Sequence, residues 1–200
     1  MANQPPPKTH GRLIRWARSY DVLIRVFSFG RERAFREKVV DLAGIKPGET
    51  VLDVGCGTGT LTMVAKERAG SDGTVHGIDA APEMIREAQR KAARDGLDIR
   101  FQTALIEELP FPDDSFDVVL SSLMLHHLPP DLKRRGIAEI ARLLNPGGRF
   151  FAVDFDPPWM GNLRVVEEAM EANGFLGIRR GKVTRWLIHY LTGKVEDVAA

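Results

Sequence analysis

Residues 50–59 run Thr-Val-Leu-Asp-Val-Gly-Cys-Gly-Thr-Gly, so a short apolar segment leads directly into three closely spaced glycines. An apolar run of this length that ends in glycine is typical of a buried strand. Glycines at 55, 57 and 59 let the backbone turn tightly while a ligand lies against it. The segment therefore predicts a strand, a tight loop and a helix in succession, with a ligand site at the end of the strand.

Downstream of this loop, short apolar runs alternate with longer amphipathic stretches. The runs predict strands over 50–54, 74–79, 99–103, 116–121 and 148–154. Helices are expected over 32–42, 60–69, 82–95, 131–144 and 162–173, and residues 13–27 have the periodicity of one or two more. This alternation predicts an α/β fold with a mostly parallel, doubly wound, Rossmann-like sheet and helices on both faces. Residues 175–180 and 183–191 are expected to form an antiparallel hairpin at one edge, turning at Gly181 and Lys182.

The length and composition favour one domain. A chain of 200 residues with 44% hydrophobic and 28% charged residues can bury a full core. We expect a disordered tail at 1–10 and a single domain at 11–200, divided into cap helices (11–44) and a sheet with its hairpin (45–200). No apolar run approaches the roughly 18 residues that span a bilayer, and residues 1–11 lack a signal-peptide core. The single cysteine, Cys56, favours a reducing compartment, so the expected location is cytoplasmic.

Charge is distributed unevenly along the chain. Residues 1–38 contain nine Lys or Arg and three acidic residues, whereas residues 39–173 contain 14 and 22. A basic, aromatic-containing segment at 11–38 is compatible with peripheral contact at a membrane surface, and equally with a lid helix that has a solvated basic face. The acidic centre and the lack of an aromatic-basic platform argue against nucleic-acid binding.

Two acidic residues indicate which ligand the glycine loop binds. Asp79 ends the second predicted strand, 20 residues beyond Gly59, where a carboxylate can accept both hydroxyls of a ribose. The third glycine of the dinucleotide fingerprint is replaced by Thr60 or Thr62, depending on where counting begins. Asp53 would repel a pyrophosphate but attract an ammonium or sulfonium group. These features favour S-adenosylmethionine over NAD or FAD as the ligand. The alternative is that the glycine loop binds no ligand and serves only as a tight turn.

Five ordered blocks of this chain resemble the class I S-adenosylmethionine-dependent methyltransferases, and among them the ubiquinone/menaquinone C-methyltransferases. The blocks are residues 20–30, 51–59, 77–84, 108–117 and 143–149. The resemblance implies a seven-stranded sheet with an antiparallel last strand and a cofactor lying across the ends of the first four strands. It assigns the cofactor site to Asp53, Gly55, Cys56, Gly57, Thr58, Gly59, Asp79, Ala80, Met84, Leu105, Ile106 and Ser122. In that assignment the loop residues hold the methionine part and Ser122 lies beneath the methyl group.

The chain also departs from these relatives at two places. Leu105 stands where the family usually has Asp or Asn for the adenine amino group, so adenine would rely on backbone contacts and packing. His126 and His127 stand where the quinone enzymes have an Arg-Asn pair.

Four residues are candidates for catalysis. His126 and His127 follow the fourth strand, and an ordinary histidine pKa near about 6.5 suits a general base, although either could form only a wall. Asp154 ends the fifth strand and could orient a hydroxyl or an amine, or cap the following turn. Tyr20 could close over the cofactor or cap the sheet edge. A metal role for the histidine pair is not expected, because no third ligand lies nearby.

Together these observations predict an enzyme that transfers the methyl group of S-adenosylmethionine to a small hydrophobic acceptor, such as a quinone, lipid or metabolite, by in-line displacement. The alternative is a non-catalytic cofactor-binding subunit that needs a partner. The sequence leaves open whether the protein is a monomer or a homodimer.

Overall fold

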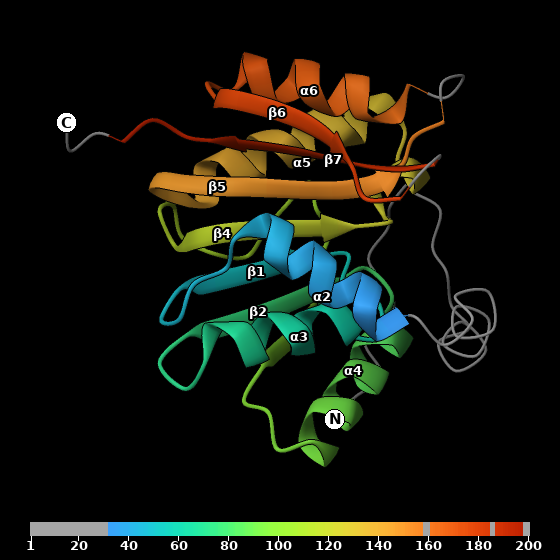
Figure 1. Cartoon of the computed structure of the whole chain (residues 1–200), viewed down its shortest axis with the longest axis vertical. Helices are drawn as coiled ribbons and strands as arrows, with labels where there is room; N and C mark the ends of the chain where they lie inside the picture. The colour runs from blue at the N-terminus through green and yellow to red at the C-terminus, as the bar shows by residue number, and fades with distance from the viewer. Residues whose placement is uncertain (1–31, 158–160, 185–186, 198–200) are drawn as a thin grey trace.

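The computed structural model describes residues 32–157, 161–184 and 187–197, and it contains a seven-stranded sheet (Figure 1). The strand order is β3-β2-β1-β4-β5-β7-β6, and β1 to β5 are mutually parallel. The strands are β1 (Thr50–Val54), β2 (Thr74–Asp79), β3 (Arg100–Thr103), β4 (Phe116–Ser122), β5 (Leu144–Phe155), β6 (Leu176–Lys182) and β7 (Ile188–Lys194). β7 is antiparallel to both of its neighbours. The predicted fold class, including the antiparallel last strand, is confirmed.

Helices cover both faces of this sheet. They are α2 (Glu32–Ala43), α3 (Thr60–Ala69), α4 (Pro82–Arg94), α5 (Pro130–Leu143) and α6 (Asn162–Ala172), and a 3-10 turn spans Leu125–His127. α2 and α3 pack on one face, and α4 packs beside them over β2 and β3. α5 and α6 pack together on the other face. The predicted helix at 13–27 and Tyr20 lie outside the described residues.

Neighbouring residues of β1 point into two different core clusters. Leu52 and Val54 of β1 point into the layer beneath α5 and α6, whereas Val51 points into the layer beneath α2 and α3. All three side chains are at most 1% exposed. Because each central strand is covered on both faces, its sequence is a continuous apolar run rather than an alternating one.

The strand order changes direction between β1 and β4, which lie side by side although two strands separate them in sequence. The chain runs outward from β1 to β3 on one side and from β4 to the hairpin on the other. A crevice forms outside the carboxyl ends of parallel strands at such a switch point. The glycine loop after β1 therefore opens into this crevice.

The turn of the hairpin is not where the sequence indicated. Gly181 and Lys182 belong to β6 and pair with Tyr190 and His189 of β7. A Cβ atom on Gly181 would lie 2.3 Å from the Tyr190 ring, so this glycine makes room for an aromatic neighbour rather than a turn. The prediction placed the turn too early because it took the glycine as a chain reversal.

In the part of the chain that the structure describes, no helix is both long and apolar enough to cross a membrane.

Candidate functional site

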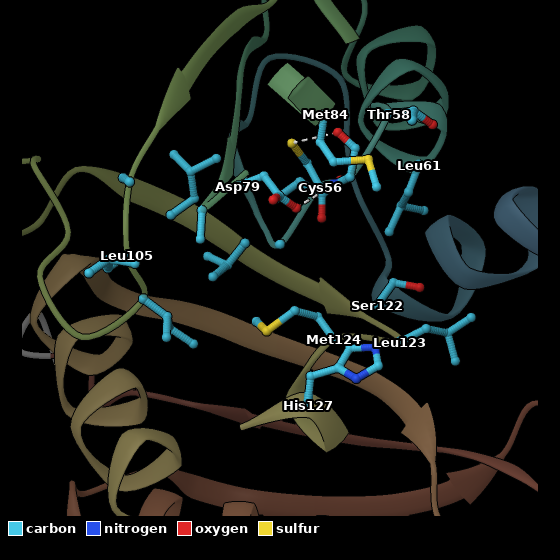
Figure 2. Close-up of a pocket in the computed structure, with 18 of the residues that line it drawn as sticks. Cys56, Thr58, Leu61, Asp79, Met84, Leu105, Ser122, Leu123, Met124 and His127 are labelled. Carbon is cyan, nitrogen blue, oxygen red and sulfur yellow. Dashed lines mark hydrogen bonds between the residues drawn. The ribbon is translucent and has the colours of Figure 1, made fainter. Parts of the chain in front are cut away.

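A cavity lies at the carboxyl ends of β1, β2 and β4, and its space, partly open to solvent, is about 1000 Å³ (Figure 2). Eleven of the twelve residues predicted for the cofactor line it; they are Asp53, Gly55, Cys56, Gly57, Thr58, Asp79, Ala80, Met84, Leu105, Ile106 and Ser122. Asp79 and Met84 point into it from one side, and Met124 and His127 face them from the other. The sheet thus brings together side chains from distant parts of the sequence.

The loop after β1 shapes the floor of the cavity. The N–H groups of Gly55 and Cys56 both donate to the Ile78 carbonyl, at 2.9 Å each, which folds the loop back onto β2. Gly55 has a φ of 74°, and a Cβ there would lie 2.4 Å from Cγ of Met124. Only glycine therefore allows this close approach between the loop and the segment after β4.

Gly59 is the predicted site residue that does not line the cavity. It precedes α3 with a φ of 79°, and a Cβ there would lie 2.9 Å from both Ala88 and Phe101. The third glycine thus permits close packing between the loop and α4. Because Gly59 is not among the residues that line the cavity, its contact with a ligand stays a prediction.

Asp79 lies where β2 ends and holds the loop in place. Its Oδ2 accepts a hydrogen bond from the Gly57 N–H at 2.9 Å, and its Oδ1 accepts one from the Ala81 N–H at 2.8 Å. Burial raises the pKa of this carboxyl, and the two backbone donors oppose that rise. Each oxygen retains acceptor capacity toward the cavity, because a carboxylate oxygen has two lone pairs.

Asp53 lies deeper in the cavity wall and is 1% exposed. Its Oδ2 accepts a hydrogen bond from the Thr62 hydroxyl at 2.6 Å, but its Oδ1 has no partner among the described residues. Burial raises the pKa of Asp53 to about 6, with a smaller contribution from the Asp79 charge. A buried acceptor without a partner costs free energy unless a ligand satisfies it.

Arg36 is a site residue that the sequence analysis did not identify. It extends from α2 into the cavity wall, is 7% exposed, and donates to the Ser122 hydroxyl at 3.0 Å. Its Nε has no hydrogen-bond partner among the described residues. The spacing of residues in α2 could have indicated that Arg36 is buried, because it falls on the same face of the helix as the buried Val39, Val40 and Ala43.

The remaining wall of the cavity is mostly apolar. Met84, Leu105 and Ile106 contribute side chains beside Ala80. Cys56 is buried against α4, donates weakly to the Gly57 carbonyl at 3.7 Å, and has a pKa raised well above the ordinary value by burial. A protonated, enclosed thiol of this kind acts as a small apolar group.

Two of the four predicted catalytic residues contact each other directly. Nδ1 of His126 lies 2.6 Å from Oδ1 of Asp154, and the His126 backbone N–H donates to Oδ2 at 2.8 Å. His127 lines the cavity, and its ring lies against that of His126 with centroids 3.9 Å apart. Tyr20 lies outside the described residues. Within them, no group of three or more His, Cys, Asp or Glu side chains is arranged to hold a metal ion.

The sheet order and the glycine loop that opens between two carboxylates define an α/β nucleoside-binding protein of the Rossmann-like class. Residues 51–148 match the model of the methyltransferase domain family. The demethylmenaquinone methyltransferase of Thermus thermophilus is 41% identical over 147 residues, which cover 74% of this chain and 66% of that protein. The Bacillus licheniformis demethylmenaquinone methyltransferase is 31% identical over 161 residues, covering 80% of this chain and 68% of that protein.

Among solved structures, an S-adenosylmethionine-dependent methyltransferase from Aquifex aeolicus superimposes with a TM-score of 0.70 and 24% identity, covering 90% of this chain and 96% of that one. The chain belongs to the class I S-adenosylmethionine-dependent methyltransferases and is similar, within them, to the quinone C-methyltransferases. S-adenosylmethionine is therefore its cofactor. The chain spans 57% to 66% of the length of the first three curated relatives that it matches.

Proposed function

We propose that this protein transfers the methyl group of S-adenosylmethionine to a small acceptor, and that the cavity at the ends of β1, β2 and β4 holds the cofactor. One observation carries the proposal. Two buried polar atoms of opposite charge, Oδ1 of Asp53 and Nε of Arg36, belong to the wall of one cavity and lack hydrogen-bond partners among the described residues.

This pair of atoms suits an amino-acid zwitterion. The cofactor ends in a methionine group whose ammonium would pair with Asp53 and whose carboxylate would pair with Arg36. Charge-assisted hydrogen bonds in a buried site are stronger than neutral ones. A pyrophosphate would place negative charge beside Asp53, so the same pair disfavours a dinucleotide.

The other residues of the cavity fit a nucleoside. Asp79 would accept the ribose hydroxyls with the lone pairs that Gly57 and Ala81 leave available. The adenine ring would lie among Ala80, Met84, Leu105 and Ile106, held by packing and backbone groups. Loop residues 55–58 would support the methionine part, and Ser122, held by Arg36, would lie near the sulfonium.

The contribution of the chain to catalysis would be alignment and exclusion of water. The bound cofactor supplies an activated methyl group on a positively charged sulfur. Asp53, Arg36 and Asp79 would fix both ends of the cofactor, so that its methyl points toward the segment that follows β4. Correct orientation of two reactants contributes up to about 7–11 kcal/mol in favourable systems.

For the acceptor we propose a small hydrophobic molecule of the quinol class. The support comes from the relatives that are named for demethylmenaquinone and ubiquinone/menaquinone biosynthesis. His127, Met124 and Leu128 form the wall at the side of the cavity where the acceptor would enter.

Calorimetry with S-adenosylhomocysteine and 5′-methylthioadenosine tests the cofactor site, because the second compound lacks the amino-acid group. Arg36→Met should weaken S-adenosylhomocysteine binding about 10- to 100-fold, as expected for a lost charged hydrogen bond, and leave methylthioadenosine binding within about 2-fold. Arg33→Met is the matched control, because Arg33 lies on the same helix with its side chain 69% exposed. Failure of the unmodified protein to bind either compound, or tight binding of NAD, would overturn the proposal.

Turnover is tested with methyl-labelled cofactor and a panel of naphthoquinols and benzoquinols, with products identified by mass spectrometry. A labelled quinol supports the acceptor class. Methylation of other compounds in a cell extract, with no labelled quinol, would contradict it.

A further inference from the structure

The contact between His126 and Asp154 is more elaborate than a chance ion pair. Asp154 is fully buried, and its carboxylate accepts three hydrogen bonds. The donors are the backbone N–H and Nδ1 of His126, and the backbone N–H of Phe155. β5 thus presents a fixed acceptor to the 3-10 turn that follows β4.

This arrangement selects one tautomer of His126. A carboxylate that already receives two N–H groups acts as an acceptor, so Nδ1 of the ring carries the hydrogen. In a neutral imidazole the other nitrogen, Nε2, then has a free lone pair. The His126 side chain is 23% exposed whereas Asp154 is buried, so the accessible edge of the ring is the one remote from Nδ1.

His126 lies beside the wall of the cavity. It is not itself a lining residue, but the two residues that follow it, His127 and Leu128, line the wall. The His126 and His127 rings lie against each other at a tilt of 47°. His126 therefore packs directly against a residue of the cavity wall.

Other charged groups surround the pair on the buried side. Lys133, which is 4% exposed, donates to the Asn162 side chain at 2.7 Å, and burial lowers its pKa against the opposing attraction of Asp154 and Asp156. Asp156 is bound by Arg180 and by the Leu163 N–H. His189 is the β7 residue that pairs with Asp154 in the ladder. Asp156 thus has hydrogen-bond partners of its own. The side chain that donates a hydrogen bond to Asp154 is that of His126.

We propose that Asp154 and His126 form a base dyad, in which His126 Nε2 removes the hydroxyl proton of a phenol-type or quinol-type acceptor. This inference rests on the proposed function. As the acceptor oxygen or its ring carbon forms a bond to the methyl carbon, the carbon–sulfur bond breaks and its electron pair stays on sulfur. The hydroxyl proton passes to Nε2, and the resulting imidazolium later releases it to water. When the ring carbon is the one methylated, that carbon then loses its own hydrogen as a proton to water and the carbonyl oxygen takes up a proton, which restores the aromatic ring. Asp154 is a positioning residue that holds the tautomer and stabilises the imidazolium.

A purely structural role is the competing explanation. The backbone hydrogen bond from His126 to Asp154 already ties the 3-10 turn to β5, and any residue except proline could make it at position 126. The additional bond from Nδ1 would stabilise the buried carboxylate in either case, but only the catalytic explanation gives Nε2 a role. The two explanations therefore differ in what they predict for the ring nitrogen that is not bound to Asp154.

A first experiment needs no acceptor. Long-range ¹H–¹⁵N NMR of the full chain should show His126 with hydrogen on Nδ1 and a free Nε2 at high pH. Asp154→Asn should change this tautomer, because an amide offers one acceptor oxygen where three donors converge. Asp156→Asn is the matched control, a buried carboxylate two residues away, and it should leave the tautomer unchanged. Hydrogen on Nε2 in the unmodified protein would overturn the dyad.

A second experiment measures methylation of reduced 1,4-naphthoquinone and related quinols. His126→Asn keeps an N–H donor for Asp154 but lacks the second nitrogen, so kcat should fall about 10²- to 10⁴-fold with unchanged S-adenosylhomocysteine affinity. Added imidazole should partly restore turnover in His126→Ala, and kcat should lose its rise with pH in both variants. Full activity of His126→Asn would overturn the dyad but not the proposed function, whereas loss of cofactor binding by the unmodified protein would overturn the proposed function.

Discussion

Asp53 shows at the scale of one residue how a binding group can oppose stability. Its carboxylate is buried, and one of its oxygens lacks a partner among the described residues. In the ligand-free protein the charged form of Asp53 therefore costs free energy. The same charge becomes favourable when a cation occupies the cavity.

We predict that Asp53→Asn makes the ligand-free protein more stable at pH 8, by up to about 3 kcal/mol for a pKa raised from 3.8 to about 6. Between these two values the folded protein binds more protons than the unfolded chain, so its free energy of unfolding falls as the pH rises. Asparagine lacks this ionisation and can still accept the Thr62 hydrogen bond. Urea denaturation at several pH values measures the effect.

The advantage of Asp53→Asn should shrink as the pH falls from 8 toward 4, where the native carboxyl is protonated too. The variant should at the same time bind S-adenosylhomocysteine more weakly at pH 8. A variant that is less stable than the unmodified protein at pH 8, or equally tight in binding, would contradict the assignment of Asp53.

Arg36 and the His126–Asp154 contact show what residue-level reasoning could and could not predict. Asp53 and the glycines follow one another in a short motif, and Asp79 ends the next predicted strand, so these positions could be predicted from the sequence. Arg36 is 17 residues before Asp53 on a separate helix, and an arginine beside other arginines resembles a solvated position. His126 and Asp154 were each identified as candidates, but their contact depends on the pairing of β4 with β5.

At the scale of elements, buried strands and amphipathic helices were predicted well, because a short continuous apolar run indicates a strand covered on both faces and a 3.6-residue periodicity indicates a helix. The bounds of β1 and β2 agree with the sequence prediction, and those of α2 differ by one residue. The hairpin turn was misplaced, because the packing of Gly181 against Tyr190 is a contact between strands. Local patterns therefore identify elements, while contacts between elements decide what each glycine does.

The contact between the glycine loop and Met124, which precedes the 3-10 turn, is a second such case. We predict that Gly55→Ala destabilises the protein by about 2–4 kcal/mol, because the new Cβ combines a φ of 74° with overlap on Met124. Gly57→Ala should cost only about 1 kcal/mol, since its φ is 55° and no atom lies within 4 Å of the new Cβ. Thermal unfolding compares the two variants.

The overlap itself is tested by the double variant Gly55→Ala/Met124→Ala. Removing the Met124 side chain should restore part of the stability that Gly55→Ala loses. Equal losses in Gly55→Ala and Gly57→Ala, with no recovery in the double variant, would indicate that backbone strain alone is responsible.

At the scale of the whole molecule, one side chain connects the far end of the sheet to the helix that carries Arg36. Arg149 of β5 donates to the Ala43 and Gly44 carbonyls at the end of α2, and it pairs with Glu49 at 2.8 Å. The Arg149 and Glu49 side chains are 16% and 15% exposed, and the pKa of Glu49 is lowered by Arg149 and the Lys46 backbone despite burial. α2 is therefore fixed at its end by Arg149 and reaches the cavity near its start through Arg36.

We predict that Arg149→Met lowers the free energy of unfolding by about 2–4 kcal/mol, because two carbonyls lose the Arg149 donor and the partly buried Glu49 carboxylate keeps only the Lys46 N–H. It should also weaken S-adenosylhomocysteine binding several-fold, although Arg149 does not line the cavity. Hydrogen exchange should rise along α2 more than along α5. Arg33→Met is the control, because its partners Glu37 and Glu67 are themselves exposed and such pairs contribute at most about 1 kcal/mol. If Arg149→Met lost stability while α2 exchange and ligand affinity stayed unchanged, Arg149 would support the sheet alone and α2 would position Arg36 without it.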